Sequence, residues 1–182
     1  MLEQAIFQAT LDELVASGYA RLSMEAVAAG AQTGKAAVYR RWASKEELVL
    51  SAMRAMLPPV GPVPDTGSLR GDLLELMRSA RSAMLSLPGS AVRVIMGELD
   101  QERARPFLGL MHECVMDPGK AAVLEVLRRG TGRGEVRPEA VTPLVADVAP
   151  ALMLYRAKMQ GPPTDADVVA LVDEVLLPLV RA

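Results

Sequence analysis

The sequence predicts an all-α protein, in which an N-terminal three-helix head with a helix-turn-helix precedes a C-terminal helical bundle. Apolar residues make up 51% of the 182 residues and recur at helical spacing. β-Branched residues never alternate with polar ones for long, so strand patterns are nearly absent. Residues 58–67 hold four prolines and two glycines, and no helix is expected to continue through them. We therefore predict two domains, residues 1–57 and 58–182.

Composition limits the classes of function. Aromatic residues are only 3% of the chain, so Leu, Val, Ala and eleven Met must build the core. The net charge of −2 argues against a globally basic nucleic-acid binder, but it is compatible with a local basic patch. A single cysteine, Cys114, rules out an intramolecular disulfide and fits a reducing compartment. No run of 18 apolar residues and no signal-peptide pattern occurs, so we expect a cytoplasmic protein without a membrane span.

The helices of the head have recognisable faces and ends. Phe7, Leu11, Leu14 and Val15 share one helical face, and Gly18 is expected to end that first helix as a left-handed cap. Ser23 and Ser44 are expected to cap the second and fourth helices, with Glu47 as the reciprocal partner of Ser44. The second, third and fourth helices are predicted at 24–29, at 35–41 and from 44 to a point before Pro58.

The C-terminal part is predicted to contain longer helices. Pro118 suits the first turn of one of them. The predicted ranges are 69–86, 90–101, 105–116, 119–129, 143–160 and 166–180.

A short basic helix dominates the segment from Ala26 to Lys45, which contains no Asp or Glu. The second helix of a helix-turn-helix lies in the major groove, so the residues at its start are expected near base edges, where Lys35 can donate to guanine. Later side chains on that helix, and the N-termini of the helices that Ser23 and Lys45 begin, suit phosphates. The predicted DNA contacts are Ser23, Thr33, Gly34, Lys35, Ala36, Ala37, Tyr39, Arg40, Arg41 and Lys45.

Ordinary structural roles compete with this interpretation. Tyr39 and Trp42 could be core aromatics, which is the preferred reading for Trp42. Arg40 and Arg41 alone could be a solvated face. The combination of the basic helix, the capping pattern and the short helix spacing favours DNA contact.

Two runs of residues, Tyr39 to Trp42 and Ser44 to Leu48, closely resemble the end of the DNA-binding domain in the tetracycline-repressor (TetR) family of bacterial transcription regulators. The resemblance covers about residues 2 to 57. It implies that Ser23, Lys35, Tyr39, Arg41 and Lys45 contact DNA.

The head departs from the family pattern at three positions. Gln32 stands at the usual turn glycine, at a cost of about 1 kcal/mol if it must adopt positive φ. Thr33 replaces an apolar residue, and Ala37 replaces a threonine that often meets DNA. These changes leave the general binding mode intact and bear on sequence preference.

The C-terminal part resembles the family's regulatory domain more weakly, through Arg133 to Arg137 and through Leu144 to Asp147 followed by Tyr155–Arg156. The resemblance implies a homodimer built by the helices at 119–129 and 143–160. Apolar faces on both helices agree with this, although each could equally be ordinary core. The predicted interface residues are Val123, Leu124, Leu127, Leu144, Val148, Leu152 and Tyr155.

The same resemblance implies a pocket for a small apolar or amphipathic molecule, although any single methionine is more often plain core. Arg78, Arg81, Arg93 and Glu98 are the polar groups expected to orient such a ligand. The predicted pocket residues are Met77, Arg81, Met84, Met96, Phe107, Met111 and Met153.

No pattern in the chain indicates catalysis, a cofactor or a metal. His112 and Cys114 have no helical ligand partner, and the glycine-rich run 130–134 lacks the preceding strand and the Lys-Ser/Thr of a phosphate loop. We therefore expect a ligand-responsive regulator, most simply a repressor, that binds a near-palindromic operator as a dimer, with the fourth helix moved by ligand. The alternative is a helical scaffold whose head, altered at Gln32 and Ala37, no longer binds DNA.

Overall fold

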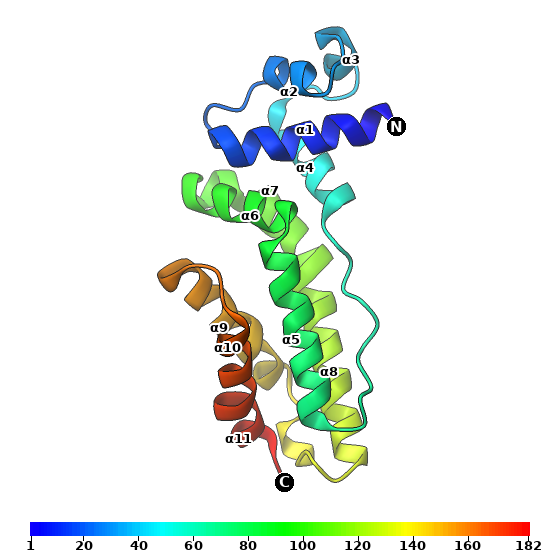
Figure 1. Ribbon diagram of the computed structural model, residues 1–182, viewed down its shortest axis with the longest axis vertical. Helices are drawn as coiled ribbons and strands as arrows, with labels where there is room; N and C mark the ends of the chain where they lie inside the picture. The colour runs from blue at the N-terminus through cyan, green and yellow to red at the C-terminus, as the bar shows by residue number, and fades with distance from the viewer. The chain divides into compact units, whose positions relative to one another are not determined.

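The computed structural model describes all 182 residues, and it is 76% helical with no strands, which confirms the all-α fold class (Figure 1). The chain forms two compact units. The first contains residues 1–58 and 83–112, and the second contains residues 59–82 and 113–182. Residues 83–112 thus pack with the head, whereas the predicted domain boundary placed them with the rest of the chain. No helix combines the length and the hydrophobicity that a membrane span needs.

The first unit is organised around α1. This helix packs against α2, α4 and α6, and α4 packs against α7. Its buried face includes Ile6, Phe7, Leu11 and Leu14. Phe7 meets the ring of Trp42 edge-on at 5.6 Å between centroids, and Trp42 is a buried core aromatic. The helices of this unit are α1 (Leu2–Ser17), α2 (Met24–Gly30), α3 (Lys35–Tyr39), α4 (Lys45–Met56), α6 (Leu87–Glu98) and α7 (Gln101–Met111).

The helix ends of the head follow the sequence with two corrections. Ser23 and Ser44 cap α2 and α4 as expected, by accepting the backbone N–H groups of Ala26 and Glu47. The Glu47 carboxylate reaches back to the N–H of Ala43, one residue before the expected partner Ser44. Gly18 has φ 86° but ψ 162°, so α1 ends in an extended glycine conformation and not in a left-handed cap.

Helices α6 and α7 both begin earlier than the sequence pattern indicated. Ser86 accepts the N–H of Gly89 and so caps the start of α6. Pro88 lies in the first turn of α6, where the missing N–H of a proline costs no helical hydrogen bond. Asp100 accepts the N–H of Arg103 and starts α7. A π-helical segment, η1 (His112–Met116), follows α7 where a continuous α-helix was predicted. α3 is shorter than predicted as well, and ends at Tyr39.

The second unit is built from α5, α8 and α9, with the last helices packed beside one another. α9 has the predicted bounds, and the predicted 166–180 helix contains a π-helical segment. Val126, Ala146, Ala149 and Val172 lie fully buried in its core. The elements are α5 (Leu69–Leu85, whose last residues belong to the first unit), α8 (Asp117–Gly132), the 3-10 turn η2 (Pro138–Ala140), α9 (Pro143–Gln160), α10 (Asp165–Ala170), η3 (Leu171–Leu176) and α11 (Leu177–Val180).

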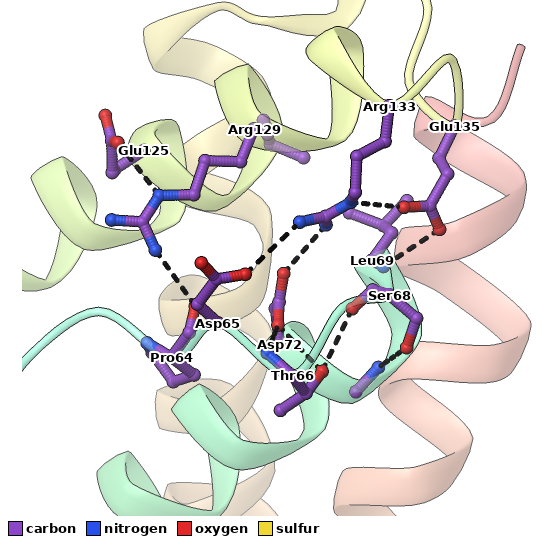
Figure 2. Close-up of polar contacts among 12 residues, drawn as sticks. Pro64, Asp65, Thr66, Ser68, Leu69, Asp72, Glu125, Arg129, Arg133 and Glu135 are labelled. Atoms are coloured by element: carbon purple, nitrogen blue, oxygen red, sulfur yellow. Dashed lines mark hydrogen bonds and ion pairs between the residues drawn. The ribbon is translucent and has the colours of Figure 1, made fainter.

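An ionic network around one buried carboxylate fixes the proline-rich segment, residues 58–67, to this unit (Figure 2). The fully buried carboxylate of Asp72 accepts the backbone N–H and the hydroxyl of Thr66 at 2.6 and 2.8 Å. Arg133 donates to Asp72 at 2.8 Å and to Glu135 at 2.6 Å, and Glu135 accepts the N–H of Leu69 at 2.9 Å. The start of α5 is therefore tied to the turn that follows α8.

Hydrogen bonding decides the ionisation of this network. Burial raises the pKa of Asp72, but the hydrogen bonds from Thr66 and Arg133, together with the charge of Arg133, outweigh it and leave that pKa below its ordinary value. The pKa of Glu135 is lowered chiefly by the backbone N–H of Leu69 and also by Arg133. Both carboxylates are consequently held in their charged form.

Candidate nucleic-acid interface

The turn between α2 and α3 is formed with Gln32 in the left-handed conformation. Gln32 has φ 52° and is the only non-glycine residue of the chain with positive φ. The backbone N–H groups of Gln32 and Thr33 donate to Ala29 and Ala28 at 3.1 and 2.9 Å, which closes the turn. Val27 and Val38 are fully buried and pack the two helices together. The helix-turn-helix thus forms with glutamine at the glycine position.

One face of α3 is open to solvent. Gly34 is its N-cap, and nothing lies within 4 Å of the position that a Cβ at Gly34 would occupy. Thr33 and Ala37 are half-buried beside this face. The exposed predicted contacts are Gly34, Lys35, Ala36, Tyr39, Arg40 and Arg41.

Arg41, Tyr39 and Lys35 on this surface contact different groups of the protein. Arg41 donates to the backbone carbonyl of Ala37 at 3.0 Å and so covers the end of α3. Tyr39 donates its hydroxyl proton to Glu25 at 3.0 Å, and Lys35 lies 3.9 Å from the same carboxylate oxygen. Glu25 was not among the predicted site residues, because only the folded turn brings α2 against α3.

Glu25 is ionised in this arrangement. Its own backbone N–H and then the Tyr39 hydroxyl lower the pKa of its carboxyl group. The same hydrogen bond raises the pKa of Tyr39, because the carboxylate stabilises the protonated phenol.

The ammonium group of Lys45 is engaged within the chain, and the predicted DNA contact at this helix start stays a prediction. Its Nζ donates to the carbonyl oxygens of Tyr19, Ala20 and Leu22 at 2.8, 3.3 and 3.4 Å. It also lies 4.8 Å from the centroid of the Tyr19 ring, in cation–π geometry. Lys45 therefore fixes the loop that leads into Ser23.

The same loop is held by α6 and α7. The N–H of Ala20 donates to Glu98 at 3.0 Å, and the ring of Tyr19 meets Phe107 edge-on at 5.8 Å. Glu98 was expected to orient a ligand and Phe107 to line a pocket. In the structure Glu98 binds the loop, and Phe107 is fully buried in the core of the first unit.

The other predicted pocket residues are divided between the two units. Met84, Met96 and Met111 belong to the first unit, and Met77, Arg81 and Met153 belong to the second. Arg81 donates to the carbonyl of Pro163 at 2.7 Å. The pocket thus stays a prediction, since neither unit contains the whole set.

The predicted dimer residues separate by exposure. Val123 and Leu127 are buried in the core of the second unit, so they face their own chain and not a partner. Leu144 and Tyr155 are 77% and 60% exposed on α9. Leu124, Val148 and Leu152 are half-buried. Leu154 and Met159, which the prediction omitted, are exposed as well.

Two family models match this chain. Residues 6–52 match the model for bacterial regulatory proteins of the tetR family, and residues 63–175 match the tetracyclin repressor-like C-terminal domain. The chain belongs to the TetR family. As a member, the protein is a DNA-binding transcriptional regulator, and the family is not an enzymatic one.

Curated relatives agree with TetR-family membership. An uncharacterised HTH-type transcriptional regulator of Mycobacterium tuberculosis is 37% identical over 177 residues, which are 97% of this chain and 86% of the relative. The DNA-binding transcriptional repressor TetR of Mycobacteroides abscessus is 35% identical over 178 residues, or 97% of this chain and 93% of the relative.

Solved structures of TetR-family regulators share the fold. The regulator PfmR from Thermus thermophilus matches with a TM-score of 0.68 and 18% identity, over 94% of this chain and 93% of the other. A regulator from Pseudomonas syringae matches with a TM-score of 0.66 and 24% identity, over 99% and 96% of the two chains.

Proposed function

We propose that this TetR-family regulator is a ligand-responsive repressor that binds a near-palindromic operator as a homodimer. The observation that carries the DNA part of the proposal is the exposed face of α3, a helix without acidic residues of its own, behind a fully formed turn. α3 enters the major groove with Gly34, Lys35 and Ala36 at the base edges, and Thr33 and Ala37 beside them. The turn at Gln32 supports a working head over a degenerate one.

Phosphate contacts surround this reading helix. Arg40 and Arg41 are exposed cations at its end, and Tyr39 carries a hydroxyl donor. Ser23 uses its hydroxyl oxygen to cap α2, which leaves the hydroxyl proton for a phosphate. Lys45 contributes through α4, whose first backbone N–H groups attract anions, while its side chain positions the loop.

An apolar stripe on α9 supports the homodimer. Leu144, Val148 and Tyr155 follow one another at i, i+4 and i+11 and so share a helical face, and two of the three are strongly exposed. In a dimer with two-fold symmetry, this stripe of one chain packs against the same stripe of the other chain. Two heads related by that symmetry read inverted half-sites, which makes the operator near-palindromic.

The regulatory role rests on the relatives and on the loop contacts. The Mycobacteroides abscessus relative is named a transcriptional repressor. A small apolar or amphipathic effector is the expected ligand for a methionine-rich bundle. Glu98 and Phe107 contact the loop before α2, so a shift of α6 or α7 would reach the reading head directly. This route adds to the movement of α4 that the sequence suggested.

A mobility-shift titration of the DNA upstream of the chain's own gene tests this function. We expect a discrete complex with an even number of chains per duplex, and weaker binding when an apolar effector is added. By linkage, the operator must weaken effector binding by the same factor. A folded protein that forms no discrete complex with the upstream DNA would contradict operator binding.

A further inference from the structure

The carboxylate of Glu25 contacts two of the predicted DNA-contacting side chains, Tyr39 and Lys35. Residues 26–45 contain no Asp or Glu, and the acids Glu25 and Glu46 border this segment. Glu25 is the second residue of α2, directly behind the cap Ser23. The side chains of Glu25 and Lys35 are 44% and 68% exposed, and Tyr39 is 48% exposed. A DNA phosphate can therefore approach all three groups.

Glu25 occupies two donors that the proposed function assigns to DNA. The Tyr39 hydroxyl donates to Glu25 Oε1 at 3.0 Å, and the Lys35 ammonium lies 3.9 Å from that same oxygen. Phosphate oxygens and carboxylate oxygens compete for the same kind of donor, since both are anionic acceptors.

Donor counting makes the two contacts of Tyr39 mutually exclusive. A phenol has one hydroxyl proton, and a phosphodiester has none to give. While that proton points to Glu25, the Tyr39 oxygen can only accept, so it cannot bind a phosphate. Lys35 has three donors and is not limited in this way, although its charge is partly neutralised by Glu25.

We propose that Glu25 is a carboxylate latch, which holds Tyr39 and Lys35 in the free protein and which DNA must displace, with a phosphate at Tyr39 and a base edge at Lys35. This inference rests on the proposed function, in which both residues contact DNA. The latch lowers affinity for every sequence, because phosphates are present in all DNA. It restrains binding to non-operator DNA, where few base contacts compensate for the displacement.

The decisive variant is Glu25→Gln, which keeps an acceptor for Tyr39 and removes the negative charge. Binding to a short random-sequence duplex is measured by fluorescence anisotropy across a salt series, with circular dichroism to verify the fold. We expect about 3-fold to 10-fold tighter binding, in line with the release of an exposed charged contact. The salt dependence should steepen by up to about 0.9 in log–log slope, because no carboxylate is left to recruit a cation. Glu3→Gln, which removes one charge from the exposed first turn of α1, should change binding less.

A double-mutant cycle with Tyr39→Phe separates the latch from other roles of Glu25. Tyr39→Phe should weaken binding more in the Glu25→Gln background than in the natural protein, because a phosphate takes the hydroxyl proton more readily from a neutral amide acceptor than from a carboxylate. Unchanged or weaker binding by folded Glu25→Gln overturns the latch. Tighter binding by Glu25→Gln with no effect of Tyr39→Phe in that background overturns the Tyr39–phosphate contact of the proposed function instead.

Discussion

At the scale of single residues, Gln32 closes the turn between α2 and α3, and Lys45 holds the loop that leads into α2. Gln32 was recognised as the residue in the glycine position of the turn, and it does adopt positive φ. Lys45 is predicted to meet phosphate at the N-terminus of α4, and its ammonium group in addition binds three backbone carbonyls. Carbonyls carry no sequence signal, so that contact could not be predicted. Glu25 was overlooked because its partners lie 10 and 14 positions away along the chain.

The conformation of Gln32 predicts a stability effect. Gln32→Gly should raise the free energy of unfolding by some tenths of a kcal/mol, because relief of the left-handed conformation slightly exceeds the added entropy of the unfolded chain. Gln32→Val should lower it, because a β-branched residue tolerates positive φ poorly. Thermal unfolding of the three proteins checks this order. A lower melting temperature for Gln32→Gly than for the natural protein would contradict it.

The exposed cation Arg41 predicts a change in DNA binding. Arg41→Ala should weaken binding to all sequences about equally and reduce the log–log salt slope by about 1. Arg105→Ala is the matched control, since it removes an exposed cation from α7. Anisotropy titrations at several salt concentrations measure both. An unchanged slope for Arg41→Ala would exclude Arg41 from the phosphate contacts.

At the scale of elements, caps decided what the sequence could predict. α9 has its predicted bounds, and in the structure Thr142 caps its start and Gly161 follows its end. α6 and α7 were misplaced because Ser86 and Asp100 were not recognised as caps. The π-helical segments η1 and η3 lie inside helical patterns and have no distinct periodicity of their own. The ionic network before α5 was also missed, because it joins residues more than 60 positions apart.

The ionic network of Asp72, Arg133 and Glu135 predicts how stability depends on pH. Both carboxyl pKa values lie below their ordinary values, so the unfolded chain binds protons more readily than the folded one. The stabilisation is complete above the unfolded pKa values of about 4 and is lost as pH falls through the lower folded values. Urea unfolding from about pH 5 to about pH 3 should show this decline. Asp72→Asn should be less stable at neutral pH and should depend less steeply on pH; an equally steep decline would contradict the role of Asp72.

At the scale of the whole molecule, the two family matches and the all-helical fold establish a TetR-family regulator. The sequence predicted this fold class from helical apolar spacing and the lack of strand patterns, and this family chiefly from a short stretch around α3. It could not separate the core residues Val123 and Leu127 from the exposed residues of α9, because helical spacing alone does not say which apolar face a helix buries.

The exposed stripe of α9 predicts assembly. Leu144→Glu should give monomers of half the natural mass, because it places a charge in an apolar contact between chains. Leu2→Glu, at a half-exposed leucine of α1, should leave the mass unchanged. Sedimentation velocity measures both. A folded Leu144→Glu protein that keeps the natural mass would place the dimer contact elsewhere.

DNase I footprinting of the region upstream of the chain's own gene tests the central claim most directly. We expect a protected, near-palindromic segment with two half-sites about one helical turn, or a multiple of it, apart. Lys35→Ala should lose this protection while keeping its fold, because Lys35 begins the reading helix. Protection that is absent, or that survives Lys35→Ala unchanged, would contradict recognition through α3.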